Sequence, residues 1–290
     1  MTSTYDTVSF LSDYGTADEF VGVVHSVIRS IAPEVRVIDV THQVPAYDVR
    51  AGALTLARAA QYLAPGVVVA VVDPGVGTAR RSIAVEVGDG ASILVGPDNG
   101  LLAPAVAMVG GATKAVELTN RAYHLAAPGP TFAGRDIFAP VAAHLCAGVP
   151  LLEVGTEIDP AGLMPTMIPL TRSDDEGLEA EALWIDRFGN VQLNVDPDEI
   201  ADHGDVVRVV AGDLSRAAQR VDTFGELGRG QVGIIVDSYG LVTVVVDRGS
   251  AAEELRLEPG DSIRLEAFAD GQGAPSGASV NVQLQPRRSP

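Results

Sequence analysis

Polar residues and glycines stand directly after apolar runs in the first half of the chain, where strands are expected to end. The first of these residues is Asp13, which follows the run Val8–Ser12. Ligands of open α/β sheets bind at the carboxyl ends of the strands, and a carboxylate there can accept hydrogen bonds from both hydroxyls of a ribose. Asp13 is therefore a candidate ribose-binding residue, although an aspartate at this position could also cap the turn before a helix.

A second segment, Asp73-Pro-Gly-Val-Gly-Thr-Ala-Arg-Arg81, follows the apolar run Val67–Val72. Its glycines allow the backbone to approach a ligand closely, and Asp73 could form a buried charged pair with Arg80 or Arg81. The Gly-x-Gly spacing lacks the third glycine of a dinucleotide-binding loop, and a strand is expected after it where that motif requires a helix. This segment therefore disfavours a classical NAD site.

In the second half, Asp186, Phe188 and Asn190 lie in one short segment between two expected strands. Their spacing places an aromatic ring between two hydrogen-bonding side chains, an arrangement that suits a purine base. A hairpin with asparagine at its turn would look similar. Further aromatic and hydroxyl side chains near strand ends in this half are Phe224, Ser238 and Tyr239.

The histidines and the cysteine show no catalytic or metal-binding spacing. The single cysteine, Cys146, lies in an apolar stretch and is expected to be a core residue. No serine or cysteine nucleophile elbow occurs. We predict no metal site, because no interval such as His-x3-His relates the five histidines, which are His25, His42, His124, His144 and His203.

The net charge and the lengths of the apolar stretches disfavour two classes of partner, nucleic acids and membranes. The net charge is -18 at pH 7, and Lys114 is the one lysine. Nucleic-acid binding needs clustered lysine and arginine, so we expect no nucleic-acid partner, and a cationic small ligand would fit this field better. No apolar stretch reaches the roughly 20 residues that span a bilayer, and Met1–Asp6 is too polar to open a signal peptide. We therefore expect a cytoplasmic protein that does not bind membranes.

The elements that must position these residues alternate between strand and helix in the first half. Continuous apolar runs such as Val67–Val72 are typical of strands covered on both faces, so the alternation predicts a Rossmann-like, layered α/β domain. Strands are expected at Val8–Ser12, Val35–Val40, Val67–Val72, Ile83–Val87 and Ser92–Val95, and helices at about Glu19–Ile31, Val49–Tyr62 and Ile137–Ala147.

The second half predicts mostly strands, separated by Gly, Asn and Asp, which indicates a smaller all-β, barrel-like domain. We expect an N-terminal α/β domain at 1–165, a linker at 166–177, a C-terminal β domain at 178–268 and a disordered tail at 269–290. The expected strands are Gly177–Asp186, Asn190–Val195, Val206–Val210, Gly233–Asp237, Leu241–Val246 and Ser262–Leu265.

Taken together, these segments resemble the SAM hydroxide adenosyltransferase family, whose substrate is S-adenosylmethionine (SAM) and whose relatives include the fluorinase and the chlorinase. The resemblance extends roughly from Val8 to Leu265. It implies an α/β domain followed by a β-barrel-like domain, a homotrimer with active sites at the subunit interfaces, and no cofactor. The motifs that carry it are Phe10-Leu-Ser-Asp-Tyr-Gly, Val71-Val-Asp-Pro-Gly-Val-Gly-Thr, Gly96-Pro-Asp-Asn-Gly-Leu-Leu, Thr131-Phe-x-Gly-Arg-Asp-Ile-Phe-Ala-Pro, Asp186-Arg-Phe-Gly-Asn and Gly249-Ser-Ala-Ala-Glu-Glu-Leu.

The resemblance also implies roles for individual residues. In the family an aspartate, an arginine and a histidine handle the attacking water, and Asp73 and Arg80 match the first two. The substrate-binding residues would be Asp13 and Tyr47 at the ribose, Phe188 and Asn190 at the adenine, Asp18, Asp186, Ser238 and Tyr239 at the methionine, with Phe132 and Phe224 also in the site.

The third catalytic position departs from the family, which usually has Thr-Phe-His-Gly-Arg-Asp where this chain has Ala133. Either this lineage does without the histidine or the residue has been substituted. Ala133 leaves the implied substrate contacts in place, so SAM binding should survive. We expect turnover to be lowered, by about 10²–10⁴-fold if the histidine transfers a proton.

The implied reaction is displacement at the ribose C5′ of SAM by water, which gives adenosine and L-methionine. The sulfonium is already a good leaving group, so the site must chiefly hold one water in line with the C5′–S bond. Arg80 would orient that water and Asp73 would hold Arg80. The alternatives are a non-catalytic SAM- or adenosine-binding protein, which Ala133 would fit; a SAM-dependent halogenase, in which Asp73 would repel the halide; and a nucleotide-dependent dehydrogenase.

Overall fold

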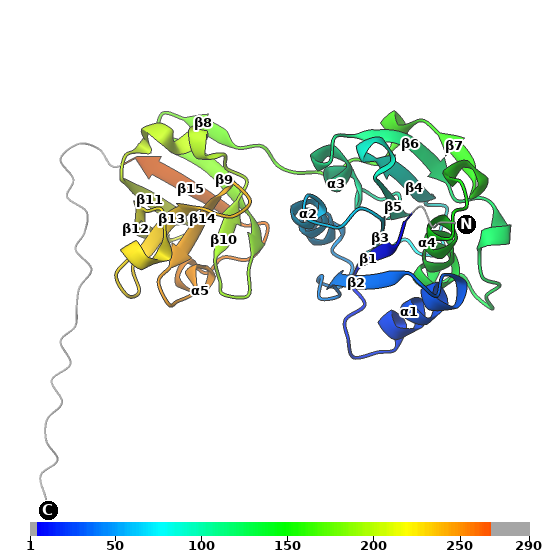
Figure 1. Cartoon of the computed structure of the whole chain (residues 1–290). Coiled ribbons are helices and arrows are strands. Elements are labelled where there is room, and N and C mark those ends of the chain that lie inside the picture. Colours follow the sequence, from blue (N-terminus) through cyan, green and yellow to red (C-terminus); the bar gives the residue numbers. More distant parts are fainter. Residues whose placement is uncertain (1–4, 268–290) are drawn as a thin grey trace, which may run out of the picture. The chain divides into compact units, whose positions relative to one another are not determined.

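The structure is a computed structural model, and it describes residues 5–267. The tail predicted at 269–290 lies outside the described residues. The chain divides between Ile168 and Pro169 into two compact units (Figure 1). No helix in the described part of the chain is both long enough and apolar enough to cross a membrane.

The first unit is built on a sheet that has seven strands within residues 5–267, in the order β2-β1-β3-β5-β4-β6-β7. The first four in this order are parallel neighbours, whereas β4 pairs antiparallel with β5 and β6. This arrangement confirms the predicted α/β layered domain. The strand bounds are β1 Thr7–Ser12, β2 Arg36–Thr41, β3 Val67–Val71, β4 Ser82–Val87, β5 Ser92–Pro97, β6 Ala112–Glu117 and β7 Thr156–Ile158.

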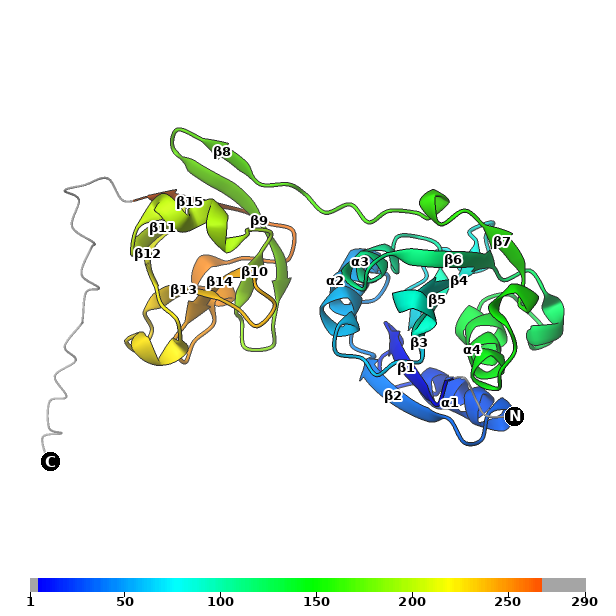
Figure 2. The same ribbon diagram turned by 45° about the horizontal axis from the view of Figure 1, so that its top comes forward.

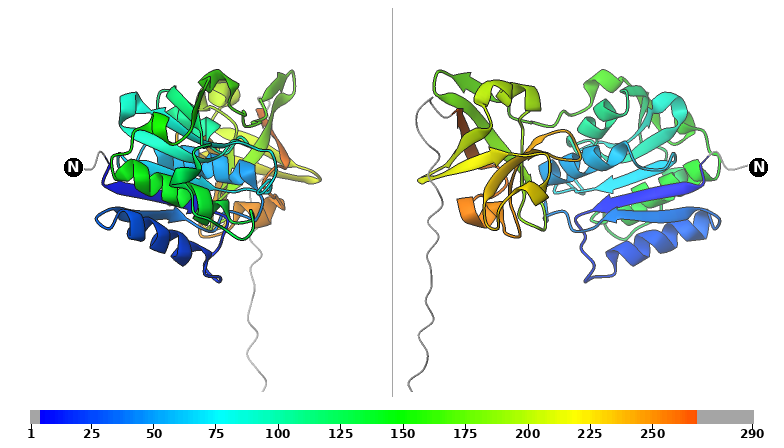
Figure 3. Two further views of the ribbon diagram at one scale, coloured as in Figure 1. Left: turned by 90° about the vertical axis from the view of Figure 1, so that its right-hand side faces the viewer. Right: turned by 60° about the vertical axis from the view of Figure 1, so that its left-hand side comes forward.

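Helices cover both faces of this sheet. Figure 2 shows α2 (Val49–Ala60) and α3 (Ala103–Met108) on one side of the strands, and α1 (Phe20–Ile31) and α4 (Ala139–Cys146) on the other. In the right-hand view of Figure 3, α1 runs beside β1 and β2.

The position of β3 inside the sheet explains why its sequence is continuously apolar. Val67, Val69 and Val71 pack in the core with α1 and α4, whereas Val68 and Ala70 pack in the core with α2 and α3. Successive side chains of a strand point to opposite faces, so a strand covered on both faces must be apolar at every position.

The helix predicted at Ile137–Ala147 differs at its start, because a π-helical turn at Gly134–Phe138 precedes α4. Pro140 then occupies the first turn of α4, where its missing N–H costs nothing. The helix holds Cys146, which is fully buried as predicted for a core residue. Burial, with a smaller contribution from the charge of Asp6, raises the pKa of this thiol to about 12.

The second unit is a closed barrel of seven strands in its described part, with β9 and β10 pairing to close the ring and β8 added outside it. It confirms the predicted barrel-like domain. Its elements are β8 Arg172–Asp174, β9 Gly177–Ile185, β10 Val191–Leu193, β11 Val206–Ala211, β12 Leu214–Arg220, β13 Val232–Val236, β14 Val242–Val246, α5 Ala251–Leu255 and β15 Ser262–Ala267.

Two strands of this unit depart from the sequence-based expectation. Strand β8 lies inside the segment expected as a linker and pairs with β9, where Asp174 Oδ1 accepts the backbone N–H groups of Glu176 and Gly177 at the turn. Strand β12 was not expected. Its sequence, Leu-Ser-Arg-Ala-Ala-Gln-Arg, holds no β-branched or aromatic residue, and its strand pairing with β11 overrides that weak propensity.

Candidate functional site

A pocket of about 300 Å³ in the first unit lies beside the carboxyl ends of β1 and β3. Its lining brings together residues from the β1, β3 and π-helix segments that the sequence analysis selected separately. The predicted site residues in this lining are Asp13, Tyr47, Asp73, Phe132 and Ala133.

Asp13 fixes the segment that carries Tyr47. Its Oδ2 accepts the backbone N–H of Tyr47 at 2.9 Å, and Tyr47 adopts a positive φ of 68° and is 74% exposed. A non-glycine residue at positive φ costs roughly 1–3 kcal/mol and tends to occur at functional sites. Glu19, not Asp13, precedes the first residue of α1, so Asp13 does not act as the helix cap.

Asp73 and Arg80 form a buried pair, with side chains 6% and 13% exposed. The Arg80 Nε donates to Asp73 Oδ1 at 2.9 Å and to Oδ2 at 3.0 Å, and Nη2 also pairs with Oδ2. Its Nη1 donates to Ser82 Oγ at 2.6 Å and to the Arg81 carbonyl at 3.2 Å. Asp73 lines the pocket and Arg80 does not, so the aspartate is the member of the pair that a ligand would meet.

Arg81 pairs with Asp98, so Arg80 is the arginine that pairs with Asp73. The Arg81 Nε donates to Asp98 Oδ2 at 2.8 Å, and Nη2 donates to the Gly162 carbonyl at 2.6 Å. Asp98 Oδ1 accepts the backbone N–H of Met164 at 2.9 Å. None of the four residues joined by these bonds lines the pocket.

Three aromatic rings form one wall of the pocket: Tyr14, Phe20 and Phe132. Their ring centroids lie 5.0–5.6 Å apart, two of the pairs edge to face. Of these three rings, only Phe132 was predicted from the sequence as a site residue. Tyr14 directly follows Asp13 and Phe20 opens α1, so their positions beside a candidate ligand-binding residue were the available signal.

The glycine of the Gly134-Arg-Asp motif makes room for Tyr14. A Cβ atom at position 134 would lie 2.3 Å from the Tyr14 hydroxyl oxygen. Burial, reinforced by the charges of Asp13 and Asp73, raises the pKa of Tyr14 above its ordinary value. The phenol therefore stays neutral and can donate a hydrogen bond.

Ala133 contributes only a methyl group to the pocket and is 6% exposed. Asp18, by contrast, is exposed and does not line the pocket. The structure thus brings together all the predicted site residues of the first unit except Asp18 and the recessed Arg80.

The second unit holds two adjoining pockets of about 480 and 490 Å³ that share Asn190 and Phe224. The first also contains Asp186, Ser238 and Tyr239, and the second contains Phe188. All six predicted site residues of this unit therefore line one or both of these pockets.

Asp186 organises the turn that presents Phe188. Its Oδ1 accepts the backbone N–H groups of Phe188 at 2.8 Å and Asn190 at 2.9 Å, and its Oδ2 accepts the Asn190 Nδ2 at 2.7 Å. In this turn Phe188 is 71% exposed. Gly189 has φ 82° and meets Ser250 so closely that a Cβ there would lie 2.0 Å from its Oγ.

Asp237 plays the corresponding part for the turn at Ser238 and Tyr239. Its Oδ2 accepts hydrogen bonds from Gln192 Nε2 at 2.6 Å and Thr243 Oγ1 at 2.9 Å, and its Oδ1 accepts the Tyr239 backbone N–H at 2.8 Å. Gln192 and Thr243 are buried, so the turn rests on a fixed polar network.

The chain matches two family models, the SAM hydroxide adenosyltransferase N-terminal domain over residues 8–155 and the C-terminal domain over residues 180–264. It is 49% identical over 263 residues to an (R)-S-adenosyl-L-methionine hydrolase of Salinispora tropica, with 90% of this chain and 97% of that protein covered. A protein of the same name from Thermus thermophilus is 39% identical, covering 89% and 98%. A fluorinase from Actinopolyspora mzabensis is 28% identical, covering 89% and 96%.

Solved structures show the same fold. An uncharacterised conserved protein from Thermotoga maritima aligns with a TM-score of 0.82 and 35% identity, covering 89% of this chain and 99% of that one. A conserved hypothetical protein from Thermus thermophilus aligns with a TM-score of 0.70 and 38% identity, with the same coverage.

Proposed function

Since this chain belongs to the SAM hydroxide adenosyltransferase family, we propose that it hydrolyses SAM to adenosine and L-methionine. The observation that carries the proposal is the buried Asp73 carboxylate, which Arg80 fixes at the pocket wall. In the reaction, a water oxygen bonds to the ribose C5′ and the C5′–S bond breaks. The bonding electron pair leaves with sulfur, which becomes the neutral thioether of methionine, and the water loses one proton.

Asp73 is the group that acts on the attacking water. Its carboxylate accepts a hydrogen bond from the water, orients a lone pair towards C5′ and favours the developing hydroxide character. Arg80 is a positioning residue in this account, because its donors are directed at Asp73, Ser82 and the Arg81 carbonyl. The sulfonium needs no protonation to leave, so no general acid is required.

A hydrolase fits this pocket better than a halogenase. A halide entering the pocket would be repelled by the negative charge of Asp73, whereas a water can donate a hydrogen bond to this carboxylate. The cationic sulfonium of SAM suits a pocket lined by both Asp13 and Asp73. The higher identity to proteins named hydrolases than to those named fluorinases also supports this choice.

Binding of SAM divides between the two units in this proposal. Asp13 and Tyr47 hold the ribose, Phe188 and Asn190 hold the adenine, and Asp186, Ser238 and Tyr239 face the methionine. We propose a homotrimer in which the pocket of one subunit's first unit is completed by a neighbour's second unit. The division of the predicted residues between separate pockets supports it, and light scattering of the purified protein would test the trimer.

Replacing Phe188 by alanine is expected to raise the KM for SAM by about 10- to 100-fold, because stacking on a base contributes roughly 1–3 kcal/mol. The effect on kcat should be smaller. Steady-state kinetics measure both. Tyr62→Ala is the matched control, since Tyr62 is 73% exposed and lies outside these pockets. An unchanged KM in the Phe188 variant would show that this ring does not contact the adenine.

Chromatography of SAM incubated with the protein, with and without added chloride, tests the proposed activity. We expect adenosine and methionine in equal amounts, above the blank without enzyme and independent of chloride. Chlorinated adenosine would instead establish a halogenase. If calorimetry detects SAM binding but no product forms, the protein binds SAM without hydrolysing it.

A further inference from the structure

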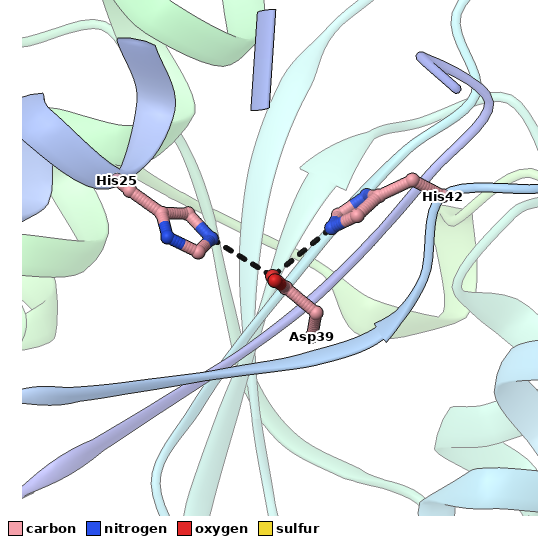
Figure 4. A group of neighbouring side chains, drawn as sticks. All are labelled: His25, Asp39 and His42. Atoms are coloured by element: carbon pink, nitrogen blue, oxygen red, sulfur yellow. Dashed lines mark hydrogen bonds and ion pairs between the residues drawn. The ribbon is translucent and has the colours of Figure 1, made fainter. Parts of the chain in front are cut away.

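His25, Asp39 and His42 meet on the first unit, although the spacing of the two histidines follows no metal-binding motif. They come from α1, from β2 and from the segment just after β2. Figure 4 shows both imidazole rings pointing at the Asp39 carboxylate. The His25 Nε2 lies 2.8 Å and the His42 Nε2 lies 3.0 Å from the same oxygen, Asp39 Oδ1.

We propose that these three side chains bind one divalent transition-metal ion of the Zn²⁺ type. Two imidazole nitrogens and a carboxylate oxygen are a donor set that such ions favour. Donors at 2.0–2.2 Å from a tetrahedral ion lie about 3.4 Å from one another. The three donor atoms here all lie within 4.8 Å of one another, so small side-chain rotations suffice to bring them to that spacing.

His42 is held in the orientation that a metal ligand needs. Its side chain is 5% exposed, and its Nδ1 lies 2.8 Å from Ser12 Oγ. To bind an ion through Nε2, His42 must carry its proton on Nδ1 and donate it to this hydroxyl, which leaves the lone pair on Nε2. In the described residues the buried Nε2 contacts the Asp39 carboxylate, with Oδ1 at 3.0 Å.

The surroundings close one side of the cluster and leave the other open. The centroid of the Phe10 ring lies 4.6 Å from that of His42 and 6.2 Å from that of His25, so Phe10 forms an apolar inner wall. The His25 and Asp39 side chains are 32% and 42% exposed. An ion can therefore enter from solvent and complete its coordination with water.

The cluster lies beside the SAM pocket without belonging to it. Ser12, which contacts His42, precedes Asp13, and the His42 carbonyl accepts the Gly15 backbone N–H at 2.8 Å. None of the three proposed ligands lines the pocket. A bound ion would join α1, β2 and the segment just after β2, and it takes no part in the proposed hydrolysis.

Titration of the untagged, chelator-treated full chain with Zn²⁺ in competition with a chromogenic chelator tests the proposal. We expect one ion per chain, and an affinity at least about 10- to 100-fold lower in His25→Gln and in Asp39→Asn. His203→Gln, which alters a histidine of the second unit, should bind as the unmodified chain does. Both test positions are partly exposed, so their replacement should preserve the fold.

Two further readings make the result decisive. Zn²⁺ should raise the Tm of the unmodified chain and of His203→Gln, but not of the two cluster variants, because an ion bound only to the folded state stabilises it. Co²⁺ should give the visible absorption of a protein-bound ion of low coordination number. Equal Zn²⁺ affinity in all four proteins, or no stoichiometric binding, would overturn the proposal.

Discussion

Replacing Asp73 by asparagine is expected to lower kcat for SAM hydrolysis by about 10²–10⁴-fold, with a much smaller rise in KM, because the amide keeps the shape but loses the charge that acts on the water. Arg80 would retain a partner in the amide oxygen, although the buried pair is weakened. Steady-state kinetics on the folded variant measure the loss, with circular dichroism to verify the fold.

Asp98→Asn is the matched control for this prediction. Asp98 also follows a strand, pairs with the adjacent arginine, Arg81, and is 3% exposed, but it lies outside the pocket. We expect a similar loss of stability in both variants and a loss of kcat only in Asp73→Asn. Equal kcat values for the two variants would contradict the assignment of Asp73 to the attacking water.

Ala133→His is expected to raise kcat by about 10²–10⁴-fold, the range that a positioned proton-transfer group contributes. Ala133 lines the same pocket as Asp73, so an imidazole there would project into the space where the water must lie. SAM binding should be nearly unchanged, because none of the proposed substrate contacts is altered. The kcat and KM of the two forms, measured side by side, check this prediction.

Ala133→Gln separates proton transfer from the effect of filling the space. Glutamine offers hydrogen bonds but does not titrate, so its kcat should stay near that of the alanine form. The rate of the histidine form should also vary with pH in the range where imidazole titrates. If all three forms turn over equally and with one pH profile, position 133 has no part in the chemistry.

The fold could be predicted where local pattern and tertiary environment agree. The apolar run of β3 fits a strand buried on both faces, and the alternation around it correctly indicated the layered domain. Strands β8 and β12 were not predicted, since Arg172–Asp174 and Leu214–Arg220 are polar and acquire strand structure through pairing with β9 and β11. Pairing partners are a property of the fold that no local window contains.

The site could be predicted only in part for the same reason. The motif around Asp73 suggested a charged pair, but the choice between Arg80 and Arg81 depends on which side chain turns towards Asp73 and which towards Asp98. The aromatic wall of the pocket was not predicted, because Phe20 and Phe132 are distant in sequence and become neighbours only in the folded chain. Residue type and position suggested the candidates, and packing decided which of them meet.

Hydrolysis of SAM by this protein in water enriched in oxygen-18 tests the central claim most directly. The account predicts that mass spectrometry finds one heavy oxygen in the adenosine, at its 5′-hydroxyl, and none in the methionine, because water forms its bond to C5′ as the C5′–S bond breaks. Adenosine without the label, or a 5′-substituted nucleoside in place of adenosine, would contradict it.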